Sequence, residues 1–463
     1  MNHTQKQSLL HDHEGNYFLV PFILVTSLFF FWGVANNMTD TLLAAFKNIM
    51  EMTDFQTSFI QLAFYGAYAV FAIPAALIIR KFNFKTGIIV GLAMYAGGTF
   101  LFYPAAQLSS YGFYLFAIYV MAGGCSILET TANPYILSMG RPENMTRRLN
   151  LAQSFNPIGS ISGIILSQIF ILSQLSANKS EMTSEMLAEA QSRELSAVTL
   201  TYMGVGAALL VVLLIILFYK KMPAAKDKTQ LAFGKTVGHI FNNRHYSFGV
   251  ITQFFYVGAQ IGVWSYTIRY VMKALNLVDP VTDQIVVENV AAFMQQYPGW
   301  SSLWNFDAAT TAENIGNSFY LTSILLFSAS RFIFTALMKY IKPGVLLGIA
   351  AVGATLSTFA AIFFSGMSGV IGLMMISFFM SLMFPTIYGI ALEKLSPTET
   401  KVGGSFLVMA ILGGALLTSL QGYLSTLFAN VALSYTVPVV CFVVVGLYGF
   451  LSYKMTQKTS TEI

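Results

Sequence analysis

The chain has 463 residues and a formal net charge of +5, and only 10% of its residues are charged whereas 56% are hydrophobic. A soluble globular protein carries about 25% charged residues. This composition therefore excludes an ordinary water-facing surface and predicts a helical protein with many membrane spans. The net positive charge reflects lysines and arginines in the loops, and it indicates no nucleic-acid partner.

Apolar stretches with at most one charged residue mark the predicted membrane spans, each near the ~20 residues that a hydrocarbon core of about 30 Å requires. In chain order they lie at 17–45, 55–79, 86–140 (two spans), 149–178 and 195–219, and then at 246–271, 317–338, 345–392 (two spans) and 402–453 (two spans). We therefore predict an all-α membrane protein with twelve transmembrane helices. Its parts are an N-terminal six-helix bundle over 17–219, a cytoplasmic linker loop over 220–245 and a C-terminal six-helix bundle over 246–454.

The basic residues give this arrangement an orientation. Of the 25 lysines and arginines, 19 fall on the side that holds both termini and the 220–245 loop, and four fall on the opposite side. By the positive-inside rule, both termini and this loop are cytoplasmic. The polar segments 179–194 and 276–316 are then predicted to be solvated external loops. An entrance lid is the alternative role for either loop.

The two halves of the sequence resemble each other in parallel order. KTGIIVG at 85–91 matches KPGVLLG at 342–348, and both follow the second span of their half. Pro134 and Pro385 are each followed 20 residues later by a Ser-Phe pair. Two parallel six-span repeats joined by a cytoplasmic link are typical of the major facilitator architecture. In that architecture the site lies near the membrane midplane, between two bundles that rock against each other.

Only two of the 20 acidic residues, Asp40 and Glu129, fall inside apolar stretches. A charged side chain at bilayer depth costs roughly 3 kcal/mol on insertion scales, so a functional role is the first explanation. Because all five histidines lie outside the spans, a carboxyl group must carry any proton that crosses the protein. Two alternatives remain. Glu129 could form a structural ion pair with Arg269 or Arg331, and Asp40 could mark the external end of the first span.

The other polar candidates within the spans are amides and indoles. A pyranose has polar edges and apolar C–H patches, so a sugar site combines amides and carboxylates with aromatic faces. The candidates are Trp32, Asn36, Asn37, Asn133, Gln153, Asn156, Gln260 and Trp264. Helix–helix hydrogen bonding, or an interfacial position for a tryptophan, is the alternative for each one. As a set they favour a sugar or polyol. The spans contain no metal-ligand cluster and no Ser-His-Asp set, so we predict no metal, no cofactor and no enzyme.

Six motifs resemble the fucose–galactose–glucose:proton symporter branch of the major facilitator superfamily, and in particular its L-fucose:proton symporters. They occur in order along residues 17–450. They are FFWGVANNMTD at 30–40, ETTANP at 129–134, LNLAQSFN at 149–156, YVGAQ with WSYTIRY between 256 and 270, PTIY at 385–388 and GSFLVM at 404–409.

This resemblance implies roles for the candidate residues. Asp40 would be the proton-coupling acid, and Glu129 would face the cavity, take part in sugar recognition and share in coupling. Gln153 and Asn156 would contact sugar hydroxyls, and their i, i+3 spacing predicts one face of the fifth span. The remaining cavity residues would be Trp32, Asn36, Asn133, Gln260 and Trp264.

The resemblance also implies a substrate and a location. We expect a monomeric importer of L-fucose and protons in the bacterial cytoplasmic (inner) membrane, with the lipid bilayer as its surroundings. Phe384 stands where these permeases carry a tyrosine, so glucose, galactose or an N-acetylhexosamine are alternative substrates. A uniporter and a membrane-embedded enzyme are further alternatives. The two acids within the spans argue against the first, and the lack of membrane histidines and nucleophile motifs argues against the second.

Overall fold

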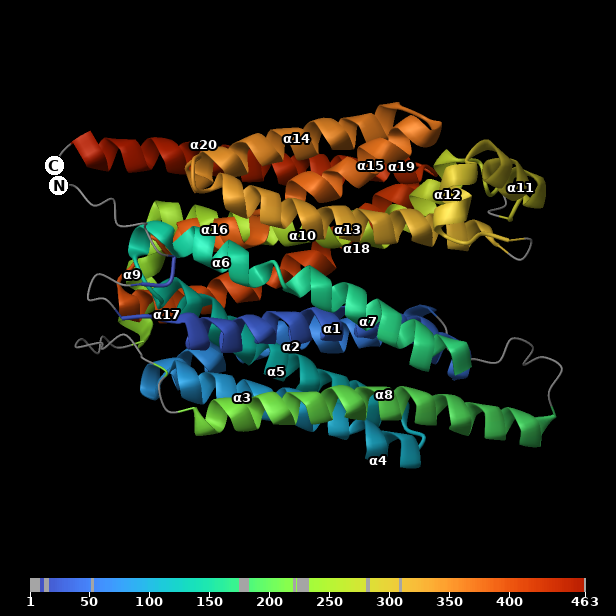
Figure 1. The fold of residues 1–463 in the computed structure, drawn as a ribbon, viewed down its shortest axis with the longest axis horizontal. Coiled ribbons are helices and arrows are strands. Elements are labelled where there is room, and N and C mark those ends of the chain that lie inside the picture. The colour runs from blue at the N-terminus through green and yellow to red at the C-terminus, as the bar shows by residue number, and fades with distance from the viewer. Residues whose placement is uncertain are drawn as a thin grey trace. The chain divides into compact units, whose positions relative to one another are not determined.

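A computed structural model describes residues 9–11, 16–50, 54–174, 183–219, 222, 233–279, 284–307 and 310–461. The chain is built from helices (Figure 1). It divides into two compact units, each described here by itself. The first unit comprises Met1–Val250 with Ala391–Leu412, and the second comprises Ile251–Ile390 with Gly413–Ile463. The bundle boundaries that the sequence suggests, 17–219 and 246–454, stay predictions.

The first unit contains the helices of the N-terminal half and one helix from the C-terminal half. They are α1 (Leu19–Ile49), α2 (Asp54–Lys81), α3 (Phe84–Phe100), α4 (Phe102–Gln107), α5 (Tyr111–Ser138), α6 (Met145–Gln153), α7 (Asn156–Phe170), α8 (Ser184–Phe218), α9 (Phe233–Asn242) and α17 (Pro397–Met409). Within this unit α5 packs against α2 and α3, α1 packs against α7, and α3 packs against α8. Helix α5 is therefore central, because it touches neighbours on two sides.

The second unit contains the remaining helices. They are most of α10 (Arg244–Ala274), α11 (Val287–Gln296), α12 (Pro298–Leu303), α13 (Ala312–Leu337), α14 (Pro343–Phe363), α15 (Gly366–Met380), most of α16 (Met383–Leu392), α18 (Gly413–Leu427), α19 (Val431–Ser434) and α20 (Thr436–Thr461). Here α14 packs against α15 and α20, and α13 packs against α15.

Close glycine contacts recur at equivalent places in the two units. A Cβ atom on Gly159 of α7 would overlap the carbonyl oxygen of Phe30 on α1. A Cβ atom on Gly413 of α18 would overlap the carbonyl oxygen of Phe254 on α10. In each half these are the first and fifth helices, and small residues let such helices approach closely in a membrane. The shared packing device agrees with the parallel repeat in the sequence.

Within the described part of the chain, nine helices are long and apolar enough to cross a membrane. The other three expected spans fall on α1, on α6 with α7, and on α10. The predicted fifth span is not one continuous helix, because α6 ends at Gln153 and α7 begins at Asn156. A proline at position 157, in the first turn of α7, is compatible with a new helix start at this point.

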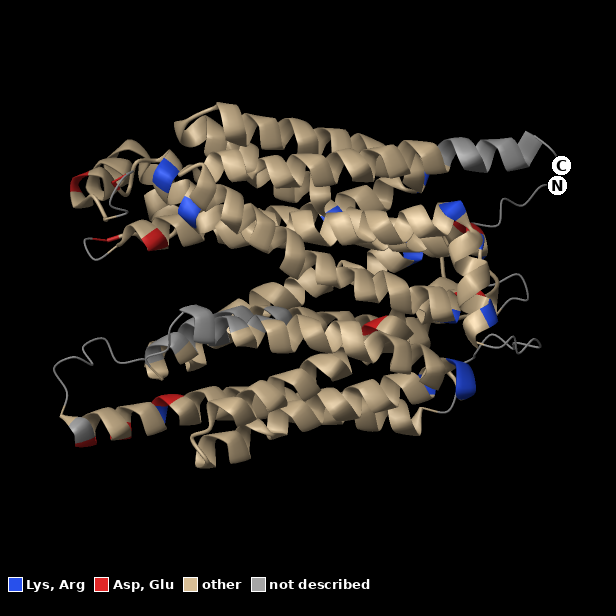
Figure 2. Cartoon of the chain, turned by 180° about the vertical axis from the view of Figure 1, so that it is seen from behind, with Lys and Arg blue, Asp and Glu red and all other residues tan. Residues whose placement is uncertain are grey.

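Polar contacts mark the end of the first unit at which α8 finishes. The Lys85 ammonium at the start of α3 donates to the carbonyls of Leu217 and Tyr219 at the end of α8, both at 2.9 Å. A cation beside the last carbonyls of a helix is favourable because these groups have no partner within the helix. Figure 2 shows that most of the described lysines and arginines of this unit gather at one end of its helices.

The N-terminal part of helix α17 contacts other helices of the first unit. It packs against α2 and α5, and the Tyr246 hydroxyl donates to the Gly403 carbonyl at 2.8 Å. The Glu399 carboxylate contacts the His239 ring on α9 and accepts from the Ser396 backbone at 2.9 Å, within a capping box. The His239–Glu399 contact therefore ties the start of α17 to α9, and the capping box fixes the first turn of α17.

The segment 276–316 is more ordered than the predicted solvated loop. It forms α11 and α12, and Val290 and Phe293 of α11 are buried. The Trp300 indole N–H donates to the Ser318 hydroxyl at 2.8 Å, and its ring stacks on Phe319 at 4.3 Å. Apolar side chains therefore anchor this segment to the start of α13, and its expected place in a solvated external loop stays a prediction. Of the other predicted loop, α8 takes up the part from Ser184 onward.

Candidate functional site

Glu129 lies within α5 and is fully buried. Neither of its carboxylate oxygens has a hydrogen-bond partner among the described residues. A buried carboxylate without partners carries a large desolvation cost. Such a group is expected where a ligand supplies the missing donors, so the structure strengthens the functional interpretation of this residue.

One turn further along α5, Asn133 presents a second unsatisfied group. Its side-chain oxygen accepts a hydrogen bond of 2.8 Å from the Gln153 amide on α6. Its Nδ2 group is buried and makes no hydrogen bond of ordinary geometry in the part of the chain that the structure describes, although it interacts with the nearby Glu129 carboxylate. Residues four apart share a helix face, so Glu129 and Asn133 place an acceptor and a donor side by side. A sugar hydroxyl can both donate and accept, and it matches this combination.

An aromatic pair on neighbouring helices of the same unit extends the site. Trp32 on α1 stacks against Tyr68 on α2, with ring centroids 6.5 Å apart and planes at 17°. The Trp32 indole N–H and the Tyr68 hydroxyl are buried, and neither has a hydrogen-bond partner among the described residues. The Ser126 hydroxyl donates to the Tyr68 carbonyl at 3.2 Å, and Tyr68 interacts electrostatically with Glu129. These contacts bring the aromatic pair and the carboxylate together.

Sequence reasoning missed Tyr68. It is one of 23 tyrosines, and nothing in the residues beside it distinguishes it from the others. The helix α2 on which it lies was recognised only as an uncharged span. Its importance follows from the packing of α2 against α5, which brings its phenol group near Glu129.

Asn156 has a structural contact. Its Nδ2 group donates to the Phe29 carbonyl of α1 at 3.2 Å, and the side chain is half-buried. Gln153, by contrast, bonds to Asn133 on α5. The two amides therefore lie on separate helices and hold different neighbours, so the expectation of one continuous helix face was wrong. The helix break between α6 and α7 is the physical reason.

Asn37 is also tied to the helix on which it lies. Its Nδ2 group donates to the Gly33 carbonyl one turn earlier, at 3.4 Å. Asn36 and Asp40 belong to α1, but their side chains lie outside the described residues. Their predicted roles, sugar binding for Asn36 and proton coupling for Asp40, stay predictions.

In the second unit, Trp264 of α10 is held by two contacts. Its indole N–H donates to the Ser377 hydroxyl on α15 at 3.2 Å. Its ring meets Phe327 of α13 edge to face at 5.0 Å. Gln260, one turn earlier on α10, is half-buried. Gln253, two turns before Gln260, is fully buried, and both of its amide atoms lack a partner among the described residues.

Arg331 is a buried cation in the second unit. Its Nε donates to the Ser381 carbonyl at 2.6 Å, and its guanidinium group lies 4.6 Å from the centre of the Phe327 ring. Ser381 follows the last residue of α15, so the cation satisfies a carbonyl at a helix end. Arg269, the other arginine considered as a partner for Glu129, is exposed within its unit.

Phe384, at the position where the resembled permeases carry tyrosine, packs among aromatic rings. Its ring stacks on Tyr388 and meets Tyr256 edge to face, both at 6.3 Å between centroids. The Tyr256 hydroxyl donates to the Met380 carbonyl at 3.1 Å. Phe384 therefore presents an apolar ring where a tyrosine would present a hydroxyl group.

The described residues include no group of three or more His, Cys, Asp or Glu side chains that could hold a metal ion. What the geometry provides instead is a set of hydrogen-bonding groups and aromatic faces within helical spans. Such a set can bind a small polar molecule and release it unchanged.

Comparisons with known proteins show the family of the chain. The family model described as Major Facilitator Superfamily matches residues 22–419. An L-fucose-proton symporter of Haemophilus influenzae is 40% identical over 456 residues, which cover 95% of this chain and 98% of that protein. A glucose/galactose transporter of Brucella abortus is 30% identical over 430 residues, 93% of each chain.

The fold also has a close counterpart among solved structures. The crystal structure of the major facilitator transporter FucP in the outward conformation matches with a TM-score of 0.80 and 32% identity, over 94% of this chain and 99% of that chain. The predicted fold class, an all-helical membrane protein of the major facilitator type, is confirmed. The chain belongs to the Major Facilitator Superfamily.

Proposed function

We propose that this protein imports L-fucose together with protons across the bacterial cytoplasmic membrane. One observation carries the proposal. Glu129 and Asn133 present an unsatisfied acceptor and donor on one face of α5, in a chain that aligns over nearly its whole length with an L-fucose-proton symporter. A member of this superfamily moves its substrate without breaking covalent bonds, so the protein is a transporter and not an enzyme.

The chemistry of the first unit fits a deoxy sugar. The Glu129 carboxylate can accept hydrogen bonds from two hydroxyls, and the Asn133 amide can donate to a ring or hydroxyl oxygen. Trp32 adds an aromatic face and a buried indole N–H. An aromatic face matches the C–H patches of a pyranose and the methyl group of fucose. Gln260 and Trp264 are proposed to contribute from the second unit.

The transport cycle in this proposal is alternating access by a monomer with both termini in the cytoplasm. Asp40 is the proposed proton-coupling acid, and Glu129 is the second carboxylate of the pathway. The 19-to-4 distribution of basic residues supports the orientation. The parallel repeat supports movement of one bundle against the other around a central site.

A glucose or galactose importer is the second candidate. Phe384 favours it, because this ring supplies no hydroxyl group at a position where the resembled fucose permeases carry one. The similarity to a glucose/galactose transporter at 30% identity also supports it, but the fucose relative is closer at 40%.

Uptake into proteoliposomes decides between these candidates. Radiolabelled L-fucose should accumulate when the outside is more acidic, and a protonophore should abolish the accumulation. Unlabelled L-fucose should compete better than glucose, galactose or N-acetylglucosamine. Uptake that follows an acid gradient but is inhibited best by glucose would favour the second candidate. Uptake of none of these sugars, in protein that remains folded, would overturn the proposal.

A further inference from the structure

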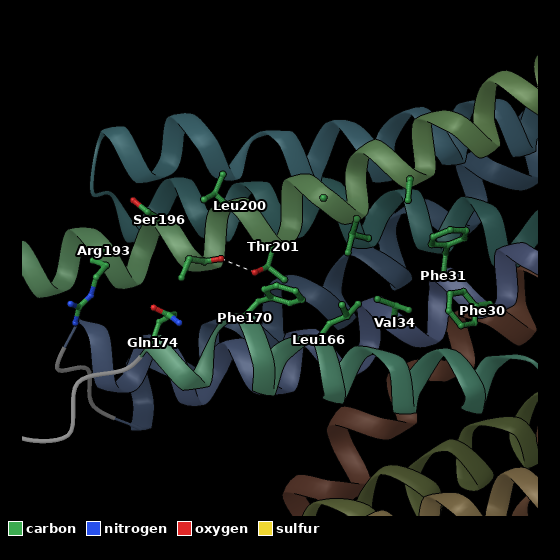
Figure 3. Close-up of a pocket in the computed structure, with 14 residues that line it drawn as sticks. Phe30, Phe31, Val34, Leu166, Phe170, Gln174, Arg193, Ser196, Leu200 and Thr201 are labelled. Atoms are coloured by element: carbon green, nitrogen blue, oxygen red, sulfur yellow. Dashed lines mark hydrogen bonds between the residues drawn. The ribbon is translucent and has the colours of Figure 1, made fainter.

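A groove of about 720 Å³ runs along the first unit between α1, α7 and α8 (Figure 3). Phe30 and Phe31 of α1, Leu166 and Phe170 of α7 and Leu200 of α8 are among its lining residues. Leu200 is 69% exposed and Phe170 is 53% exposed, so the rim of the groove lies on the surface of the unit. On spanning helices, exposed apolar side chains of this kind face hydrocarbon.

The polar lining residues gather at one end of the groove. Arg193, Ser196 and Gln174 lie together there, whereas Phe30 and Phe31 lie at the far end (Figure 3). The two hydroxyl groups of the α8 wall are already used within that helix. Ser196 donates to the Ser192 carbonyl at 2.8 Å, and Thr201 donates to the Ala197 carbonyl at 2.7 Å. The groove therefore has one cationic end and a long apolar floor, which does not suit a sugar.

The depth of the groove corresponds to one leaflet of a bilayer. Helix α8 ends at Phe218, just before a basic stretch, and the lining residue Ala208 is ten residues earlier. At ~1.5 Å per residue Ala208 lies about 15 Å from that end, near the middle of a ~30 Å hydrocarbon core. Arg193 lies about 22 Å beyond Ala208 by the same rise, which places it in the headgroup region of the opposite side.

We propose that this groove binds a membrane glycerophospholipid. One acyl chain lies along the apolar floor from Leu200 towards Phe31, and the phosphodiester group accepts hydrogen bonds from the Arg193 guanidinium. Charge complementarity favours a phosphate-containing headgroup, because guanidinium groups recognise phosphate oxygens with paired donors. The length of the groove matches the thickness of a single leaflet of the bilayer. This inference concerns the lipid-facing side of the first unit and does not depend on which sugar is carried.

Glycines offer a test that leaves helix packing intact. Gly204 lines the groove, and a Cβ atom added there would meet no other atom within 4 Å. Gly204→Trp therefore adds a large ring to the groove wall at a position where the first side-chain atom meets no neighbour. Gly97 on α3 also has open space at its Cβ position and is exposed, but it lies outside the groove. Gly97→Trp is the matched control for the added side chain.

The experiment is native mass spectrometry of the purified full-length protein titrated with a palmitoyl-oleoyl phosphatidylglycerol. We expect the affinity for the first bound lipid to fall by about tenfold in Gly204→Trp and in Arg193→Gln. This change corresponds to about 1.4 kcal/mol for each variant. Gly97→Trp should bind as the native protein does. Glu189→Gln should bind at least as tightly, because its loss removes a negative charge one turn from Arg193.

Four outcomes would overturn the proposal. Equal lipid retention by Gly204→Trp and Gly97→Trp would exclude the groove. Unchanged binding by Arg193→Gln would exclude the phosphate contact. Equal binding of water-soluble glycerophosphoglycerol, which has no acyl chain, would reduce the site to an anion contact at Arg193. If Gly204→Trp changed the oligomeric mass while lipid binding persisted, the groove would be an interface between copies and the proposal would also fail.

Discussion

The Gln153 amide donates a hydrogen bond of 2.8 Å to the side-chain oxygen of Asn133, and this contact joins α6 to α5 one turn from Glu129. Both side chains are buried. The bond orients the Asn133 amide so that its Nδ2 group, and not its oxygen, remains available to a ligand. Gln153 therefore acts on the proposed sugar through Asn133, in addition to any direct contact.

This relationship gives a first prediction. Gln153→Leu removes the donor and leaves the buried Asn133 oxygen unsatisfied, a cost of about 1–3 kcal/mol. We expect affinity for L-fucose to fall by at least fivefold, with a small loss of thermal stability. Calorimetric titration of the single and double variants with Asn133→Leu measures the coupling. Strictly additive losses would show that the two residues act independently.

The second prediction concerns the buried carboxylate. Glu129→Gln keeps the size of the side chain and one acceptor but removes the charge. Loss of one charge-assisted hydrogen bond is worth about 1.5–3 kcal/mol, so affinity for L-fucose should fall by roughly tenfold or more. Helix content by circular dichroism should not change. If affinity is unaltered, Glu129 returns to the alternative of a structural pair with Arg269 or Arg331.

The third prediction concerns coupling. Asp40→Asn replaces the proposed proton carrier with a group of the same shape that cannot titrate. Accumulation of sugar driven by a pH gradient should be lost, whereas exchange of sugar between the two sides should continue. Counterflow in proteoliposomes measures the exchange. Continued accumulation against a sugar gradient would show that another group carries the proton.

The fourth prediction concerns orientation. Asn242 at the end of α9 and Glu288 at the start of α11 are both exposed within their units. Single cysteines at these positions, in a protein whose buried Cys125 and Cys441 have been replaced, report the side of the membrane. An impermeant thiol reagent added to intact cells should label Glu288→Cys and spare Asn242→Cys. The reverse labelling pattern would invert the assigned topology.

The fifth prediction concerns Arg148, a fully buried cation at the start of the fifth predicted span. Its guanidinium group donates to the carbonyls of Ile136 and Leu137 at 2.8 and 2.7 Å, which satisfies the end of α5.

We expect Arg148→Ala to destabilise the protein by about 3 kcal/mol or more, since hydrogen bonds to a charged group contribute about 1.5–3 kcal/mol each. Arg148→Lys should restore only part of the loss, because an ammonium group lacks the planar fork. Thermal unfolding in detergent is the measurement, and Arg147→Ala on the neighbouring half-buried side chain is the control. A melting temperature of Arg148→Ala equal to that of the control would contradict this role.

Composition and apolar patterning are sufficient to assign the class of protein and the membrane spans. A hydrocarbon core of about 30 Å demands about 20 apolar residues per helix and makes every internal charge costly. Glu129 could therefore be recognised from an uncharged window, without any knowledge of its neighbours. The parallel halves could be recognised because matching segments, KTGIIVG and KPGVLLG, and matching proline spacings recur in the same order.

Which polar groups meet depends on how the helices pack in three dimensions. Gln153 and Asn133 are 20 residues apart, and Tyr68 lies on a different helix from Glu129, so no local pattern connects them. The break between α6 and α7 depends on how both pack on neighbouring helices. Hydrogen bonds within the membrane form between helices that are brought together by side-chain packing. Partners in such contacts are set by the packing geometry, which a one-dimensional pattern of apolar residues does not encode.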